Sequence, residues 1–184
     1  MPHIDLGVDD QTFPGMAGLA QYRPDTAGPM LQLAQILLRG PSTLPPGERE
    51  LIASYVSTLN GCGFMILTHG AFAAAQLDGG MPLVTQVNSD PETAPVSDKL
   101  RALLRIAAAT RESGRQVSEE AVKAARAAGA TDLEIHDTVL IAAATSMFNR
   151  YVDGLATSYP DDPAPYAEQA KQVIANGYNT DASF

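Results

Sequence analysis

Wherever apolar residues recur regularly in this chain, they recur at the spacing of an α-helix. The stretch 30–38, MLQLAQILL, shows the pattern. Its apolar residues form one helical stripe and are Met30, Leu31, Leu33, Ala34, Leu37 and Leu38. No segment alternates convincingly between apolar and polar residues, as a half-buried strand does. An all-α fold is therefore predicted.

Capping residues and helix breakers divide the chain into successive predicted helices. These helices cover residues 27–39, 47–59, 62–76, 98–113, 119–128, 132–159 and 165–176. The longest of them opens on Thr131-Asp132-Leu133-Glu134, which has the pattern of a capping box. Residues 1–26 are rich in Gly, Pro and Asp and are predicted to form an extended arm, docked on its own domain or on a partner subunit. Residues 81–97 are predicted to be a connection with one short helical turn.

Composition limits the class of protein. With 184 residues, 45% of them apolar and 18% charged, the chain suits one globular domain over 1–184. The net charge of −9 and the lack of any Lys/Arg cluster argue against nucleic-acid binding. No apolar run has the length of a membrane span, and the acidic N-terminus lacks the pattern of a secretory signal. The single cysteine fits a reducing cytosol, so a cytoplasmic protein with no membrane partner is expected.

The only cysteine and one of the three histidines lie close together in the sequence. His69 follows Cys62 by seven residues, which is about two helical turns, so both side chains are predicted to share one helix face. The breaker Asn60-Gly61 places Cys62 in the first turn of its helix, where unpaired N–H groups and the helix dipole favour a thiolate. An imidazole near a thiol favours the thiolate, which is the nucleophile of a reactive cysteine. A lone cysteine in an apolar helix is also commonly a small buried residue, and that interpretation stays open.

The segment from Arg49 to Ala71 carries a resemblance to a known family. Its pattern is R-E-L-I-x-x-x-V-S-x-L-N-x-C, with a histidine seven residues after the cysteine. This resembles the carboxymuconolactone decarboxylase and alkylhydroperoxidase D superfamily, and more narrowly its peroxidase-related branch. Supporting stretches are Phe13-Pro14-Gly15-Met16, Tyr22-Arg23-Pro24, Arg39-Gly40, Ser42-Thr43-Leu44 and Phe148-Asn149-Arg150. The resemblance implies an all-α fold, an active site built around the cysteine-bearing helix, and a homo-oligomer, commonly a dimer, trimer or hexamer.

The same resemblance implies roles for individual residues. Redox members carry C-x-x-C followed after three residues by His, with a Glu twelve residues before the first Cys. Glu50, Cys62 and His69 match three of these positions, whereas Met65 stands where the second Cys belongs and Phe64 where His or Tyr is frequent. In the family the second sulfur attacks the peroxide and the first resolves the sulfenic acid. The dithiol mechanism is therefore impossible in this chain, because a thioether neither ionises nor forms a disulfide.

Three hypotheses of function follow. In the first, Cys62 is the thiol of a one-cysteine hydroperoxide reductase, with His69 as base and Glu50 relaying protons, and an external thiol resolves the sulfenic acid. In the second, His69 and Glu50 perform acid/base chemistry on a small organic acid or lactone without sulfur. In the third, the chain has lost catalysis and binds an apolar small molecule.

All three hypotheses need a small-molecule pocket and no cofactor. Phe64 and Met65 are predicted to line this pocket, with Tyr55 on the preceding helix as a further candidate. No two histidines have the spacing of metal ligands, so no metal site is predicted.

Overall fold

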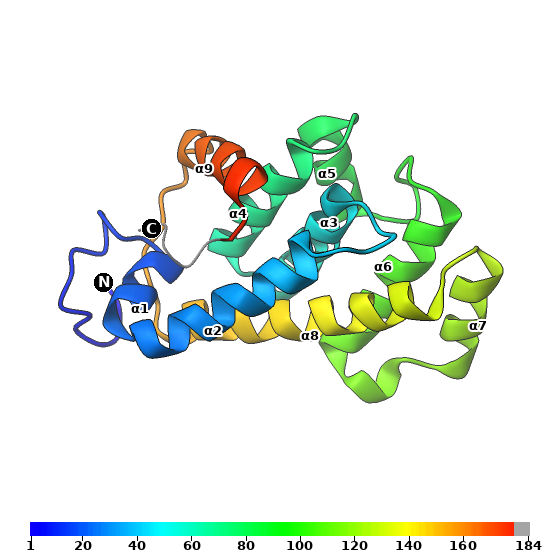
Figure 1. Cartoon of the computed structure of the whole chain (residues 1–184), viewed down its shortest axis with the longest axis horizontal. Helices are drawn as coiled ribbons and strands as arrows, with labels where there is room; N and C mark the ends of the chain where they lie inside the picture. Colours follow the sequence, from blue (N-terminus) through cyan, green and yellow to red (C-terminus); the bar gives the residue numbers. More distant parts are fainter. Residues whose placement is uncertain (179–184) are drawn as a thin grey trace.

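The structure is a computed structural model that describes residues 1–178, and within this range it contains helices and no strand. Figure 1 shows them as a bundle with the long helix α8 running along its length. The helices are α1 (Met16–Tyr22), α2 (Pro24–Ala34), α3 (Pro46–Asn60), α4 (Gly63–Ala74), α5 (Gly80–Ser89), α6 (Asp98–Glu112), α7 (Glu119–Ala127), α8 (Asp132–Gly154) and α9 (Ala164–Asn176). A π-helical turn, Gln35–Arg39, continues α2, and a 3₁₀ turn, Gly114–Gln116, follows α6. The predicted all-α class is confirmed.

Helix α3 is the centre of the bundle. It packs against α4, α5, α6 and α8, and its residues from Arg49 to Ser57 are all buried. Gly61 joins α3 to α4 with φ of 76°, a left-handed conformation that glycine adopts without a steric penalty. The tight turn holds α3 and α4 as an antiparallel pair, so side chains separated by about 20 positions can meet between them.

The N-terminal arm is shorter than the sequence predicts. Residues 16–22 form α1, and α2 begins at Pro24 rather than at residue 27. A helix of seven residues is too short to show a periodic pattern, and burial of Leu19 and its alanine neighbours stabilises it instead. The remaining arm docks on its own domain: the backbone N–H of His3 donates to Leu155 at 2.9 Å, and that of Gly15 donates to Ser158 at 2.8 Å.

Helix α5 corrects a second prediction, because residues 81–97 were expected to contain only one helical turn. The ten-residue helix Gly80–Ser89 buries Val84 and Val87, which lie three positions apart on one face. Pro82 is tolerated because it lies in the first turn, where backbone N–H groups have no helical partner. Helix α8 also ends earlier than predicted, at Gly154, and the segment beyond it receives the arm.

The predicted capping box at the start of α8 is confirmed. Thr131 accepts a hydrogen bond from the Glu134 backbone at 3.2 Å, and Glu134 accepts one from the Thr131 backbone at 2.8 Å, which completes the capping box. Ser97 and Ser118 cap α6 and α7 more simply, because each accepts one hydrogen bond at 3.1 Å from a backbone N–H in the first turn of its helix.

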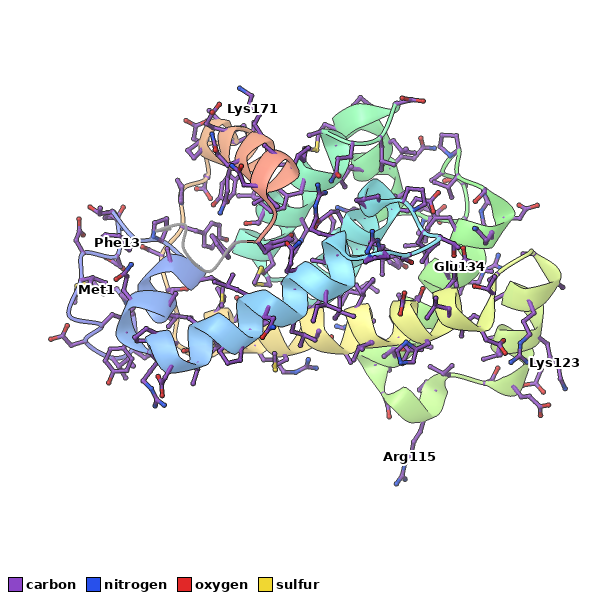
Figure 2. All side chains as sticks on the ribbon, viewed as in Figure 1. Met1, Phe13, Arg115, Lys123, Glu134 and Lys171 are labelled. Atoms are coloured by element: carbon purple, nitrogen blue, oxygen red, sulfur yellow. The ribbon has the colours of Figure 1, made fainter. Side chains whose placement is uncertain are left out.

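Most charged side chains lie at the surface, and Glu134 is an exception. Figure 2 shows Arg115 and Lys123 projecting outward, whereas Glu134 lies inside, and only 1% of it is exposed. Burial alone would raise the pKa of Glu134, but hydrogen bonds from Lys99, the Thr131 backbone and Thr43 outweigh it and lower the pKa to about 2. Among residues 1–178, no helix is both long and apolar enough to cross a bilayer.

Candidate functional site

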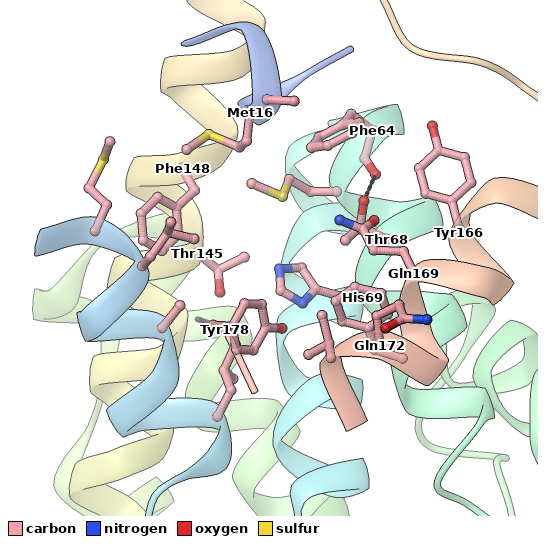
Figure 3. A pocket seen from close by; sticks show the side chains of 18 of the residues that line it. Met16, Phe64, Thr68, His69, Thr145, Phe148, Tyr166, Gln169, Gln172 and Tyr178 are labelled. Carbon is pink, nitrogen blue, oxygen red and sulfur yellow. Dashed lines mark hydrogen bonds between the residues drawn. The ribbon is translucent and has the colours of Figure 1, made fainter. Parts of the chain in front are cut away.

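A cavity of about 490 Å³ lies between α2, α4, α8, α9 and the segment that follows α9 (Figure 3). Its wall is mostly apolar. The larger apolar side chains on it include Met30, Leu37, Met65, Phe72, Ile141 and Phe148. The polar side chains on it include Thr68, His69, Thr145, Gln169, Gln172 and Tyr178. No Asp, Glu, Lys or Arg lines the cavity in the described chain, so the cavity suits a neutral and largely apolar molecule.

His69 is the imidazole on the wall of this cavity. Glu50, which does not line the cavity, forms a hydrogen bond with it. The Nδ1 atom of His69 on α4 lies 2.8 Å from Oε2 of Glu50 on α3. An ionised carboxylate only accepts hydrogen bonds, so an ionised Glu50 selects the tautomer that carries the proton on Nδ1 and leaves the lone pair of a neutral imidazole on Nε2. Figure 3 shows the imidazole projecting into the cavity, with Thr145 facing it from α8. The arrangement is an imidazole on the cavity wall, oriented by a buried carboxylate.

Tyr178 completes the hydrogen bonding of Glu50. Glu50 is fully buried, and its second oxygen, Oε1, accepts a hydrogen bond from the Tyr178 hydroxyl at 2.8 Å. Burial, and then the adjacent Glu50 carboxylate, raises the pKa of Tyr178 well above its usual value, so the hydroxyl stays protonated and donates. The carboxylate is thus held at both oxygens, by side chains from two distant parts of the chain.

Phe64 and Met65, both predicted to line the pocket, lie on the cavity wall. Met65 precedes His69 by four residues, about one helical turn, so the two side chains lie on the same helix face. The Phe64 ring packs against the rings of Tyr159 and Tyr166, with centroids 6.4 and 6.2 Å away. In this chain the position of the missing second cysteine is part of an apolar wall.

Cys62 lies outside this cavity. It is the N-cap residue of α4, its side chain is fully buried, and it is not among the residues that line the cavity. Burial raises the pKa of the Cys62 thiol to about 12, and the nearby Asp153 carboxylate adds to the rise. Hydrogen bonds from the Met65 backbone and the Asn149 side chain favour the thiolate but do not offset burial. Seven residues of helix also separate Cys62 from His69 by about 10 Å along the axis, too far for a direct hydrogen bond.

Tyr55 is also placed away from the cavity. It is buried on α3 and does not line the cavity in the part of the chain that the structure describes. Burial raises the pKa of Tyr55, and the carboxylates of Glu92 and Asp90 contribute to the rise. This position differs from the predicted pocket role.

Sequence reasoning missed Thr145 and Tyr178. Both reach the cavity from helices or segments that are remote in sequence from α4, and neither belongs to a motif with its own spacing. Only the packing of α8 on α3 and of α9 on α4 brings them to the cavity. Among residues 1–178, no group of three or more His, Cys, Asp and Glu side chains is arranged to hold a metal ion.

Comparison with solved structures supports the resemblance. An uncharacterized peroxidase-related protein from Silicibacter sp. TM1040 is 25% identical, with a TM-score of 0.75 over 85% of this chain and 80% of the other. An alkylhydroperoxidase AhpD core protein, described as an uncharacterized peroxidase-related protein from Ralstonia eutropha JMP134, is 22% identical, with a TM-score of 0.77 over 93% of this chain and 95% of the other. No protein-family model and no curated protein matches the sequence. The chain thus has the alkylhydroperoxidase D-like fold, and its resemblance to the peroxidase-related proteins of that superfamily is confirmed.

Proposed function

We propose that this protein catalyses proton transfer on a neutral, largely apolar carbonyl compound, such as a lactone, with His69 as the base. The observation that carries the proposal is the buried hydrogen bond of 2.8 Å between His69 Nδ1 and Glu50, at the wall of an apolar cavity. A histidine oriented by a carboxylate is a common general base, because the carboxylate fixes the tautomer and stabilises the imidazolium that forms. Apolar walls strengthen both effects by excluding water.

The proposed step breaks one C–H bond. The proton beside the substrate carbonyl moves to His69 Nε2, and its electron pair moves through the carbon–carbon bond to the carbonyl oxygen. The Thr145 hydroxyl faces His69 across the cavity and is suited to donate a hydrogen bond to that oxygen. His69 then returns the proton to another atom of the same substrate, so the reaction is an isomerisation with no net oxidation.

The absence of cations from the cavity wall narrows the substrate class. A substrate carboxylate would enter a space that no Lys or Arg lines in the described chain, and an unpaired charge is costly to bury. A lactone or another neutral carbonyl compound avoids this penalty. Of the two substrates named in the acid/base hypothesis, the cavity therefore favours the lactone over the small organic acid.

The first test uses 5-nitrobenzisoxazole, a neutral aromatic whose ring opens to a coloured phenolate when a base removes one C–H proton. We expect His69→Gln to lower the rate in the protein by at least about 100-fold, the usual scale of general base catalysis. Cys62→Ala is the matched control on the same helix and is expected to retain the rate. An unchanged rate in His69→Gln, or a lost rate in Cys62→Ala with an intact fold, contradicts the proposal.

A one-cysteine thiol peroxidase is the second candidate. The retained Glu50, Cys62 and His69 and the likeness to peroxidase-related proteins favour it. Titration with cumene hydroperoxide, followed by trapping of sulfenic acid and intact mass measurement, distinguishes it from the first. Stoichiometric trapping at Cys62 that is lost in His69→Gln would support the peroxidase, whereas an unmodified Cys62 supports proton transfer. Saturable binding of 5-nitrobenzisoxazole without turnover would instead identify a binding protein.

We further propose that the chain forms a homo-oligomer through α8. Leu133, Leu140 and Met147 recur every seven residues along this helix, so they lie on one face. They are 54%, 37% and 46% exposed, respectively. A row of large exposed apolar side chains is typical of a surface that another chain covers.

A further inference from the structure

We propose that Tyr178 is a positioning residue of this site, one that orients His69 by holding the Glu50 carboxylate. The inference rests on the proposed function for its catalytic consequence, whereas the hydrogen bonds that carry it stand on their own. The Tyr178 hydroxyl donates to Glu50 Oε1 at 2.8 Å, and His69 Nδ1 occupies Oε2 at the same distance. With one donor at each oxygen, the carboxylate cannot rotate without leaving a buried polar group unpaired.

Tyr178 is itself held in place by contacts that do not involve Glu50. Its backbone N–H donates to Oε1 of Gln35 at 2.7 Å, and its ring packs against Phe72 with centroids 6.1 Å apart. Gln35 opens the π-helical turn, and Arg39 at the other end of that turn donates to the Ile174 carbonyl at 3.0 Å. The turn thus fixes both the end of α9 and the segment after it.

The residue before Tyr178 makes this approach sterically feasible. Gly177 has φ of 75°, and a Cβ atom there would lie 2.5 Å from Oε1 of Gln35. Any side chain at this position would strain the backbone and would also displace the end of the Gln35 side chain, which accepts the hydrogen bond from the Tyr178 backbone. The glycine lets the chain pass close to Gln35 and bring the hydroxyl to Glu50.

Two guanidinium groups also act on these side chains. The charge of Arg39 acts on Tyr178 from the π-helical turn and favours its ionised form, against the effect of burial. Arg49 is the neighbour of Glu50 on α3, and the two side chains interact electrostatically. Both guanidinium groups remain when the Tyr178 hydroxyl is removed, so a change in proton affinity does not come from the loss of either charge.

The test follows the titration of the His69 ring nitrogens by NMR in the full chain, without any substrate. Tyr178→Phe removes one donor from the ionised carboxylate, so we expect the Glu50–His69 pair to bind its proton more tightly. The midpoint of His69 should rise by about one pH unit, the scale of one hydrogen bond to a charged group. The matched control is Tyr166→Phe, because the Tyr166 hydroxyl donates to the Pro160 carbonyl at 2.8 Å and not to Glu50. The His69 midpoint should not move in this variant.

A second background separates positioning from packing. In Glu50→Gln the carboxylate is gone, so adding Tyr178→Phe should leave the His69 midpoint unmoved. An unmoved midpoint in Tyr178→Phe alone, or an equal shift in both backgrounds, overturns the inference.

The outcome for Tyr178 can be told apart from the outcome for the proposed function. A Glu50-dependent shift without turnover of 5-nitrobenzisoxazole leaves the positioning role intact and removes the proton-transfer function. Turnover that depends on His69, without any shift of the His69 midpoint in Tyr178→Phe, keeps the proton-transfer function and removes the positioning role of Tyr178.

Discussion

Two residues on one helix, Cys62 and His69, meet opposite surroundings in this structure. Cys62 caps α4 from a fully buried position outside the cavity, whereas His69 lies two turns later at the cavity wall with a carboxylate behind it. The N-terminus of α4 favours the Cys62 thiolate, but the cost of burying the charged thiolate is larger, so the pKa of the thiol rises. Because burial is the larger effect, the Cys62 thiol stays protonated, and His69 is the side chain that is available for chemistry.

A direct consequence concerns the reactivity of Cys62. With a pKa of about 12, roughly one thiol in 10⁵ is ionised at neutral pH, and the buried sulfur reacts only when the structure opens. We expect iodoacetamide to leave the native protein unlabelled under conditions that label it promptly in concentrated urea. Intact mass measurement follows both reactions, and rapid labelling of the native protein would contradict the burial described here.

At the scale of an element, the start of α8 joins three parts of the fold. Glu134 completes the capping box of its own helix and also accepts hydrogen bonds from Lys99 of α6 at 2.8 Å and from Thr43 at 2.9 Å. The buried carboxylate therefore links α8 to α6 and to the loop before α3. Its charge is stabilised in the folded state only.

This linkage makes stability depend on pH. The pKa of Glu134 is lowered to about 2 from a usual 4.5, so its contribution is complete above about pH 4.5 and is lost as the pH falls toward 2. We expect up to about 3 kcal/mol of unfolding free energy to disappear over this range. Urea unfolding at several pH values should show a flatter profile in Glu134→Gln. The control Glu168→Gln removes an exposed partner of Lys171 and should keep the slope of the unchanged protein.

The elements that the sequence predicted well are those with local signals. Thr131 with Glu134, Ser97 and Ser118 mark helix starts through backbone hydrogen bonds that depend only on nearby residues. Helices α1 and α5 lack such caps, and α5 contains a proline that suggests a break. Their stability comes from burial against distant parts of the chain, which a single sequence does not display.

At the scale of the whole molecule, the exposed row on α8 predicts an assembly. We expect light scattering to give a mass above that of one chain, and the double variant Leu140→Glu/Met147→Glu to give the mass of one chain, because burying two carboxylates at an interface is costly. Ile4→Glu, an exposed apolar residue on the arm, is the control and should leave the assembly intact. A single-chain mass for the unchanged protein would contradict the proposal.

The candidate site shows where prediction from sequence ends. Glu50 and His69 lie in a motif and on adjacent helices, so their pairing follows from a short hairpin. The Tyr178 hydroxyl contacts Glu50, which lies 128 positions earlier in the sequence, and no local sequence pattern predicts such a contact. The burial of Cys62 likewise depends on α8, which supplies Asn149 and Asp153 near it.

The long reach of Tyr178 also sets the order in which the site is completed during synthesis. The hairpin that holds Glu50 and His69 can form on the ribosome as soon as α4 has emerged, since its contacts span only 19 positions. The second donor to the carboxylate arrives only when residue 178 has left the exit tunnel. A nascent chain whose residue 178 is still inside the tunnel therefore lacks the second hydrogen bond to the Glu50 carboxylate, the one that Tyr178 donates in the folded chain.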